Sequence, residues 1–230
     1  MAGASGFKGD QKLPLRSPLA KAERRLIDRL IPKFPRWLQG YHLTLMTVLW
    51  SAGVILAGYL ARERLGWLWL ASAMLFLQWF SDSFDGSLGK HRDTGIPKWG
   101  YYMDHLLDYG FMASIIVGYA VLFDGRERFT FFILVPIIGG FIVNSYLSFA
   151  ATSEFKITFM GLGPTEVRLM LIILNTAIII FGTGFVEAAL PYVPYVAGSA
   201  LILVVYRTQR YIWAVDMEDK RKRVENRPPA

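Results

Sequence analysis

The sequence of 230 residues contains no cysteine and only three histidines. The lack of cysteine excludes disulfide frameworks, thiolate zinc sites and cysteine nucleophiles. Charged residues make up only 19% of the chain, whereas hydrophobic residues make up 53%. This balance is incompatible with a disordered chain, a coiled coil or a collagen-like repeat. The chain also lacks an internal repeat and any connection long enough to form a second domain.

Apolar residues occur in six blocks, each long enough to cross a bilayer, which takes about 20 residues of helix. The predicted spans are residues 42–61, 66–84, 105–123, 129–150, 167–186 and 193–213. Six such blocks leave too few polar residues to cover the surface of a soluble protein. We therefore predict an all-α integral membrane protein with six transmembrane helices. Its parts are a basic N-terminal segment (1–41), a six-helix transmembrane domain (42–213) and a basic tail (214–230).

Positive charge is distributed unevenly about these spans, within a net charge of +7. Four arginines fall on one side of the predicted bundle: Arg62, Arg64, Arg126 and Arg128. All other Lys and Arg residues fall on the opposite side. Because positive loops are retained in the cytoplasm, both termini are expected there. The first forty residues are polar and basic, which predicts no cleavable signal peptide, and basic residues that flank spans do not indicate nucleic-acid binding.

The stretch 17–37 has an apolar stripe among basic residues. Its apolar members are Leu19, Leu26, Ile27, Leu30 and Ile31. A helix of this kind can lie on an anionic membrane surface with Trp37 at the headgroups, and we predict such an interfacial helix. An ordinary solvated cytosolic helix is the alternative.

Four carboxylates lie in or beside the second and third predicted spans, joined by a link from Asp85 to Asp104. Asp82 and Asp85 are three residues apart, and Asp104 and Asp108 are four apart, so each pair projects from one helix face. Antiparallel helices would bring the two faces together at the cytosolic end of the bundle. Charged groups in spans are costly and therefore indicate function. Carboxylates that repel one another at close range predict a divalent cation such as Mg²⁺ or Mn²⁺.

Small residues and a cation accompany these carboxylates. Gly86 and Gly89 leave room for a bulky anion, Gly100 lies one turn before Asp104, and Lys90 offers a positive charge to a phosphate. Metal and lysine around a diphosphate indicate phosphoryl-group transfer. The alternative is that the aspartates are helix caps and ion-pair partners.

The pattern D-x2-D-G-x2-G-K-x9-G-x3-D-x3-D, over residues 82–108, resembles the signature of the CDP-alcohol phosphatidyltransferase family. That signature has Ala and Arg where this chain has Gly89 and Lys90. Glycine keeps the first position small. Lysine keeps the charge but loses the planar fork of arginine that binds a phosphate through two hydrogen bonds.

The resemblance implies roles for the motif residues. Asp82, Asp85, Asp104 and Asp108 would hold the metal, with Asp108 also the general base. The CDP moiety would bind at the following residues: Asp82, Gly86, Gly89, Lys90 and Gly100. Asp108 would take the proton of an acceptor hydroxyl, whose oxygen attacks the β-phosphorus of the CDP-alcohol and releases CMP. A homodimer is usual in the family.

Two substrate assignments remain open within the family. CDP-diacylglycerol could donate a phosphatidyl group to a polar alcohol, or a soluble CDP-amino alcohol could donate its head group to diacylglycerol. The short six-span chain resembles the first subgroup more. Outside the family, a divalent-cation transporter is the alternative, but its carboxylates should lie near the bilayer midplane and not at one face.

Residues 161–168 open the fifth predicted span, where Pro164 and Thr165 favour a helix start. Glu166 and Arg168 lie at the depth of the carboxylates and are candidates for an acceptor pocket. Other polar residues within spans are predicted to form hydrogen bonds between helices: Asn144, Ser145 and Asn175. His105 is predicted to pack or to contact headgroups and not to bind the metal, because it points about 100° away from Asp104 on a helix.

Overall fold

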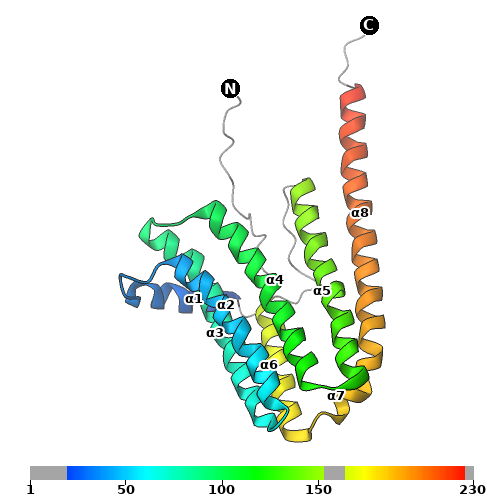
Figure 1. The fold of residues 1–230 in the computed structure, drawn as a ribbon. Coiled ribbons are helices and arrows are strands. Elements are labelled where there is room, and N and C mark those ends of the chain that lie inside the picture. The colour runs from blue at the N-terminus through cyan, green and yellow to red at the C-terminus, as the bar shows by residue number, and fades with distance from the viewer. Residues whose placement is uncertain (1–19, 153–163, 226–230) are drawn as a thin grey trace.

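The structure is a computed structural model that describes residues 20–152 and 164–225. Most of these residues are helical, and no strand is present among them (Figure 1). The α-helices are α1 (Ala20–Leu30), α2 (Gly40–Ala61), α3 (Leu68–Arg92), α4 (Pro97–Leu122), α5 (Gly125–Thr152), α6 (Pro164–Phe181), α7 (Gly184–Ala189) and α8 (Val193–Glu225). Three short 3₁₀ turns are η1 (Ile31–Lys33), η2 (Leu65–Trp67) and η3 (Leu190–Tyr192). Some of the basic residues that were expected on the cytoplasmic side lie outside the described part of the chain, namely Lys8, Lys12, Arg16, Lys156 and Arg227.

Five helical stretches are long and apolar enough to cross a membrane. They correspond to α2, α4, α5, α6 and the stretch Gly184–Val224, which joins α7 to α8. The chain is thus built as a multi-pass membrane protein. Helix α3, which corresponds to the second of the six predicted spans, is not among the five because polar Gln78, Asp82 and Asp85 interrupt its second half. The count of six therefore stays a prediction.

Helix α2 packs along both α3 and α4, and these three helices form one half of the bundle (Figure 1). Two contacts that only glycine permits hold α2 in place. A methyl group added at Gly40 would lie 2.5 Å from the carbonyl oxygen of Asp85 on α3. At the other end of α2, a methyl group at Gly58 would overlap the backbone of Gly118 on α4. The backbones therefore approach closely where side chains are missing.

The link between α3 and α4 is shorter than predicted. Residues 85–104 were expected to connect two spans, but α3 continues to Arg92 and α4 begins at Pro97. Asp93 ends α3 in the left-handed conformation (φ 54°), and the Thr94 N–H donates to the Gly89 carbonyl at 3.1 Å. Proline then starts α4, where its missing N–H costs nothing. The sharp turn places the aspartates on regular helices and not in a loop.

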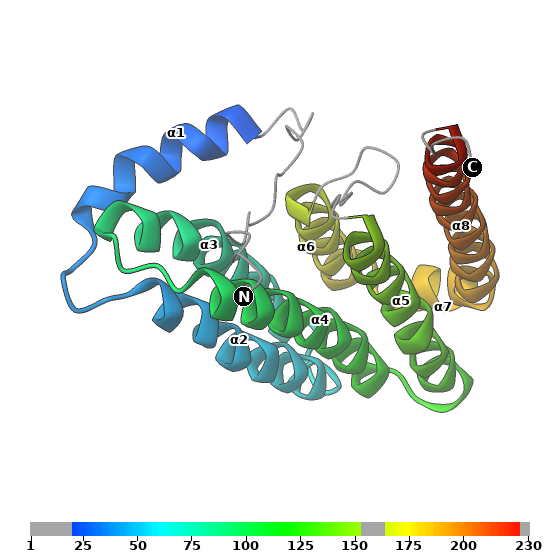
Figure 2. The ribbon, with the colours of Figure 1, turned by 90° about the horizontal axis from the view of Figure 1, so that it is seen from above.

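The N-terminal helix α1 lies crosswise to the bundle (Figure 2). Ile27 and the following Ile31 are buried in a cluster with Phe84 and Leu88 of α3. Part of the apolar stripe that predicted a membrane-surface helix is thus covered by protein. Contact of α1 with lipid stays a prediction.

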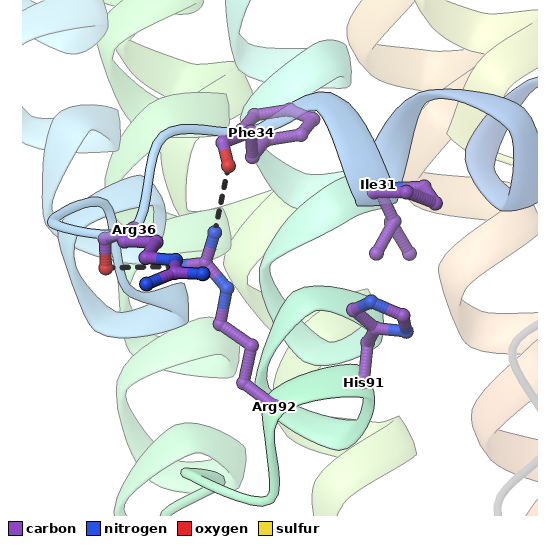
Figure 3. Close-up of a pocket in the computed structure, with 6 residues that line it drawn as sticks. Ile31, Phe34, Arg36, His91 and Arg92 are labelled. Carbon is purple, nitrogen blue, oxygen red and sulfur yellow. Dashed lines mark hydrogen bonds between the residues drawn. The ribbon is translucent and has the colours of Figure 1, made fainter.

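Arg92 holds the segment between α1 and α2. Its guanidinium donates hydrogen bonds to the backbone carbonyls of Phe34 (3.0 Å) and Arg36 (3.2 Å), which Figure 3 shows. It also donates to the carbonyls of Pro35 (3.0 Å) and Leu38. A pocket of about 320 Å³ opens beside it, lined by Ile31, Pro32, Phe34, Arg36, His91 and Arg92. One side chain therefore satisfies several carbonyls of a segment that has no regular structure of its own.

We expect Arg92→Met to lower the free energy of unfolding by about 1–3 kcal/mol, because it removes charged hydrogen bonds while keeping the length of the side chain. Thermal unfolding of the purified protein in detergent would measure the change. Arg24→Met is the control, because Arg24 forms an exposed ion pair with Asp28, which contributes little to stability. Equal melting temperatures for the two variants would contradict the anchoring role.

The remaining long helices pack on the half formed by α2, α3 and α4: α6 packs against α3, and α5 packs against α4 and carries α8. Helix α6 begins at Pro164, as predicted, and ends before Gly182, whose φ of 78° favours glycine. Helix α8 runs to Glu225, beyond the predicted end at residue 213, and projects past the other helices (Figure 1). At about 1.5 Å per residue, its 33 residues span about 50 Å, which exceeds the bilayer core of about 30 Å.

Two asparagines form the predicted hydrogen bonds between helices. Asn175 of α6 accepts from the Tyr119 hydroxyl of α4 at 2.6 Å and donates to Ser72 of α3 at 3.1 Å. Asn144 of α5 donates to Thr208 of α8 at 3.2 Å. Ser145 instead bonds within its own helix, to the carbonyl of Phe141.

Candidate active site

Three aspartates from two helices form a compact group. Asp82 lies on α3, and Asp104 and Asp108 lie one turn apart on α4. One carboxylate oxygen from each lies within 4.8 Å of the other two. The three residues are half-buried, and they converge because α3 and α4 both pack along α2 and are joined by the turn between Arg92 and Pro97. Carboxylates from α3 and α4 thus form a single polar cluster.

Asp85 is engaged beside this group. Its carboxylate accepts a hydrogen bond from the Thr44 hydroxyl of α2 at 2.6 Å and another from the N–H of Gly86. Its predicted role as a metal ligand stays a prediction. The contact with Thr44 was not predicted, because a threonine in an apolar helix carries no distinguishing signal.

Arg168 brings a positive charge to the aspartates. Its guanidinium lies 2.8 Å from a carboxylate oxygen of Asp82. The pair is largely shielded from solvent, with 12% of the Arg168 side chain and 22% of the Asp82 side chain exposed. The prediction that Arg168 lies at the depth of the aspartates is therefore confirmed. Glu166 lies in the first turn of the same helix and is half-buried, and the acceptor pocket predicted at these two residues stays a prediction.

Gln78 is a site residue that the sequence analysis missed. Its side-chain amide donates a hydrogen bond to a carboxylate oxygen of Asp108 at 3.1 Å. Gln78 precedes Asp82 by one turn on α3 and is 1% exposed. A signal was available, because an uncharged polar side chain in an apolar helix, one turn from a carboxylate, falls on the same face.

The predicted CDP-binding residues have different surroundings. A methyl group added at Gly86 or Gly100 would meet no described atom within 4 Å, so packing does not require glycine at either position. Gly89 is buried, and a methyl group there would lie 3.3 Å from the Cα of Gly95 in the turn that follows. Glycine at 89 therefore lets the α3–α4 turn fold back closely. Lys90 is exposed on the last turn of α3.

The cluster of three aspartates fits a divalent cation. Its ligand atoms are hard oxygens, which suit Mg²⁺ and Mn²⁺. Carboxylates that approach within 4.8 Å repel one another, and a shared cation offsets that repulsion. None of the three lines the pocket of Figure 3, which belongs to the junction of η1 with the end of α3.

His105 packs among aromatic rings, as predicted. Its ring centroid lies 4.2 Å from that of Tyr101 and 5.2 Å from that of Tyr146. The Tyr146 hydroxyl of α5 also donates to the His105 carbonyl at 2.9 Å. These contacts attach the first half of α4 to α5.

A family model described as CDP-alcohol phosphatidyltransferase matches residues 39–210. The match covers most of the chain, and the chain belongs to the CDP-alcohol phosphatidyltransferase family. A protein of Cutibacterium acnes (strain DSM 16379 / KPA171202) named phosphatidylinositol phosphate synthase is 34% identical over 90 residues. The aligned part covers 36% of this chain and 41% of that protein, so the chain spans less than half the length of this curated relative. No solved structure matches the chain.

Proposed function

We propose that the protein is a phospholipid-synthesis enzyme that transfers a phosphatidyl group from CDP-diacylglycerol to a polar alcohol and releases CMP. The observation that carries the proposal is the group of Asp82, Asp104 and Asp108, in a chain whose helices are apolar enough to lie in a bilayer. A lipid donor reaches such a site from within the membrane. Family membership supports the same class of reaction.

In this proposal Asp82, Asp85, Asp104 and Asp108 hold Mg²⁺ or Mn²⁺. The cation, when bound, neutralises charge on the diphosphate of the donor. Lys90 and the backbone at Gly86, Gly89 and Gly100 bind the CDP part of the donor.

Asp108 acts as the general base. Its carboxylate takes the proton from the acceptor hydroxyl, and the hydroxyl oxygen forms a bond to the β-phosphorus of the donor. The bond from that phosphorus to the oxygen of CMP breaks, and CMP leaves with its electron pair. Asp108 suits this role because Gln78 holds one of its oxygens at 3.1 Å.

A phosphorylated alcohol such as inositol phosphate is the proposed acceptor. The name of the Cutibacterium acnes relative supports this choice. Arg168, which lies against Asp82, supports it as well, because a guanidinium suits a phosphate. Glu166 would complete the acceptor pocket. We further propose that both termini and the site face the cytoplasm and that the protein forms a homodimer.

The test is CMP release by the purified protein with Mn²⁺ or Mg²⁺. CDP-diacylglycerol would be paired with glycerol phosphate, inositol phosphate or serine, and CDP-choline or CDP-ethanolamine with diacylglycerol. We expect release to require CDP-diacylglycerol and to be fastest with inositol phosphate. Metal removal with a chelator should abolish it. Turnover of a CDP-amino alcohol with diacylglycerol would instead assign the protein to the second subgroup.

A further inference from the structure

The side-chain amide of Gln78 is a buried polar group that is hydrogen-bonded to the cluster of three aspartates. Its Nε2 donates to Asp108, so the hydrogen bond joins α3 to α4. The neighbours of Gln78 on the same face of α3 are buried: Leu75 and Ser81 are 2% and 1% exposed. Gln78 therefore lies below the polar site, on the side away from the α3–α4 turn.

The amide of Gln78 is satisfied on one side only. Its Oε1 is buried and has no hydrogen-bond partner among the described residues. Leaving a buried acceptor unpaired costs free energy. Asn175 shows the contrasting case, because both ends of its amide are bonded, to Tyr119 and Ser72. Asn175 thus has the pattern of a structural interhelical link, and Gln78 does not.

A hydrogen bond to one carboxylate oxygen fixes the rotation of the whole group. With one oxygen of Asp108 held by Gln78, the second oxygen is left for a cation or for the proton of the acceptor. The amide is neutral at every working pH, so it orients the carboxylate without neutralising the negative charge that a cation would bind. Groups that orient metal ligands in this way affect metal affinity although they do not touch the metal.

We propose that Gln78 is a positioning residue that fixes the orientation of the Asp108 carboxylate for metal binding and proton transfer. The proposal rests on the function proposed above, in which Asp108 is a metal ligand and the general base. It goes beyond that function by assigning a role to a side chain outside the family motif.

The test uses Gln78→Met, which keeps the length of the side chain and removes its donor and its unpaired acceptor. Mn²⁺ affinity of the full-length protein in detergent would be measured by electron paramagnetic resonance of free Mn²⁺. We expect affinity to fall about 10–100-fold and kcat for CMP release to fall by a similar factor. The KM for CDP-diacylglycerol should change less than about threefold, since Gln78 does not bind the donor.

A double-mutant cycle with Asp108→Asn separates positioning from general structural damage. If Gln78 acts through Asp108, Gln78→Met will not weaken Mn²⁺ binding further in the Asp108→Asn protein. An equal loss in both backgrounds, or wild-type affinity of Gln78→Met alone, would overturn the inference. Asn175→Leu is the matched buried-amide control and should lower the melting temperature without changing Mn²⁺ affinity. If the Asn175→Leu control does not fold, the double-mutant cycle still shows whether Gln78 acts through Asp108.

The cycle also distinguishes failure of this inference from failure of the proposed function. If Asp108→Asn leaves Mn²⁺ affinity and CMP release unchanged, both are wrong. If Asp108→Asn impairs both and Gln78→Met impairs neither, only the positioning role is wrong.

Discussion

Replacing Asp108 with asparagine is expected to lower the kcat for CMP release by about 10²–10⁴-fold, the usual contribution of a general base. Asparagine keeps the shape of the side chain and can still face Gln78, but it cannot take the acceptor proton. Initial rates with saturating CDP-diacylglycerol and Mn²⁺ would measure the loss. Near-normal CMP release would show that Asp108 is not the base.

Two further aspartate variants sharpen this test. Asp104→Asn removes a proposed metal ligand but leaves the proposed base, so a higher Mn²⁺ concentration should restore part of the activity of this variant. The same Mn²⁺ concentration should restore no activity to Asp108→Asn, which lacks the base. Asp93→Asn is the matched control at the same end of the bundle. Asp93 ends α3 at φ 54°, a conformation that asparagine also accepts, so its activity should stay within about twofold of wild type.

Gly86→Ala and Gly100→Ala are expected to abolish most activity without harming the fold. An added methyl group meets no described atom at either position. Alanine in a helix is more stable than glycine by about 0.5–1 kcal/mol, so melting temperatures should stay equal or rise. If CDP lies against these positions, a displacement of about 1 Å would cost about 10²-fold in kcat/KM. CMP release and thermal unfolding on the same samples would measure both effects.

The controls for the glycine variants lie on the same helices or beside them. Gly110 of α4 is equally open, but it points about 200° away from Asp108, so Gly110→Ala should keep full activity. Gly58→Ala should lower the melting temperature, whereas Gly86→Ala should not, because a methyl group at Gly58 would overlap the backbone of Gly118. Full activity of Gly86→Ala and Gly100→Ala would remove both from the proposed CDP site.

Much of this site could be predicted because its information is local. The spacing of Asp104 and Asp108 on one helix face needs only the period of a helix, and the antiparallel turn after α3 brings Asp82 to them. The length of the α3–α4 link could not be predicted from hydropathy, because α3 and α4 continue as helices through polar residues. Asp93 and Pro97 were the signals for the true ends of these helices.

The parts that could not be predicted depend on contacts between helices that are distant in sequence. Thr44 meets Asp85 only because Gly40 lets α2 approach α3 at that level. The burial of Ile27 and Ile31 by Phe84 and Leu88 is likewise a tertiary contact, and the same apolar stripe is compatible with lipid or with protein. Sequence periodicity shows that a face is apolar but not what covers it.

The close approaches of α2 at Gly40 and Gly58 have a consequence for genetic screens. Helix α2 supplies none of the three clustered carboxylates, yet it is fixed to α3 near the site and to α4 at the far end. A bulky residue at Gly40 would push α3 away from α2, and one at Gly58 would push α4 away from α2, so either would shift one of the two helices that carry the aspartates. Inactive alleles that map to this helix would then resemble lesions of the aspartates proposed to act in catalysis, although their primary defect is a change in the distance between α3 and α4.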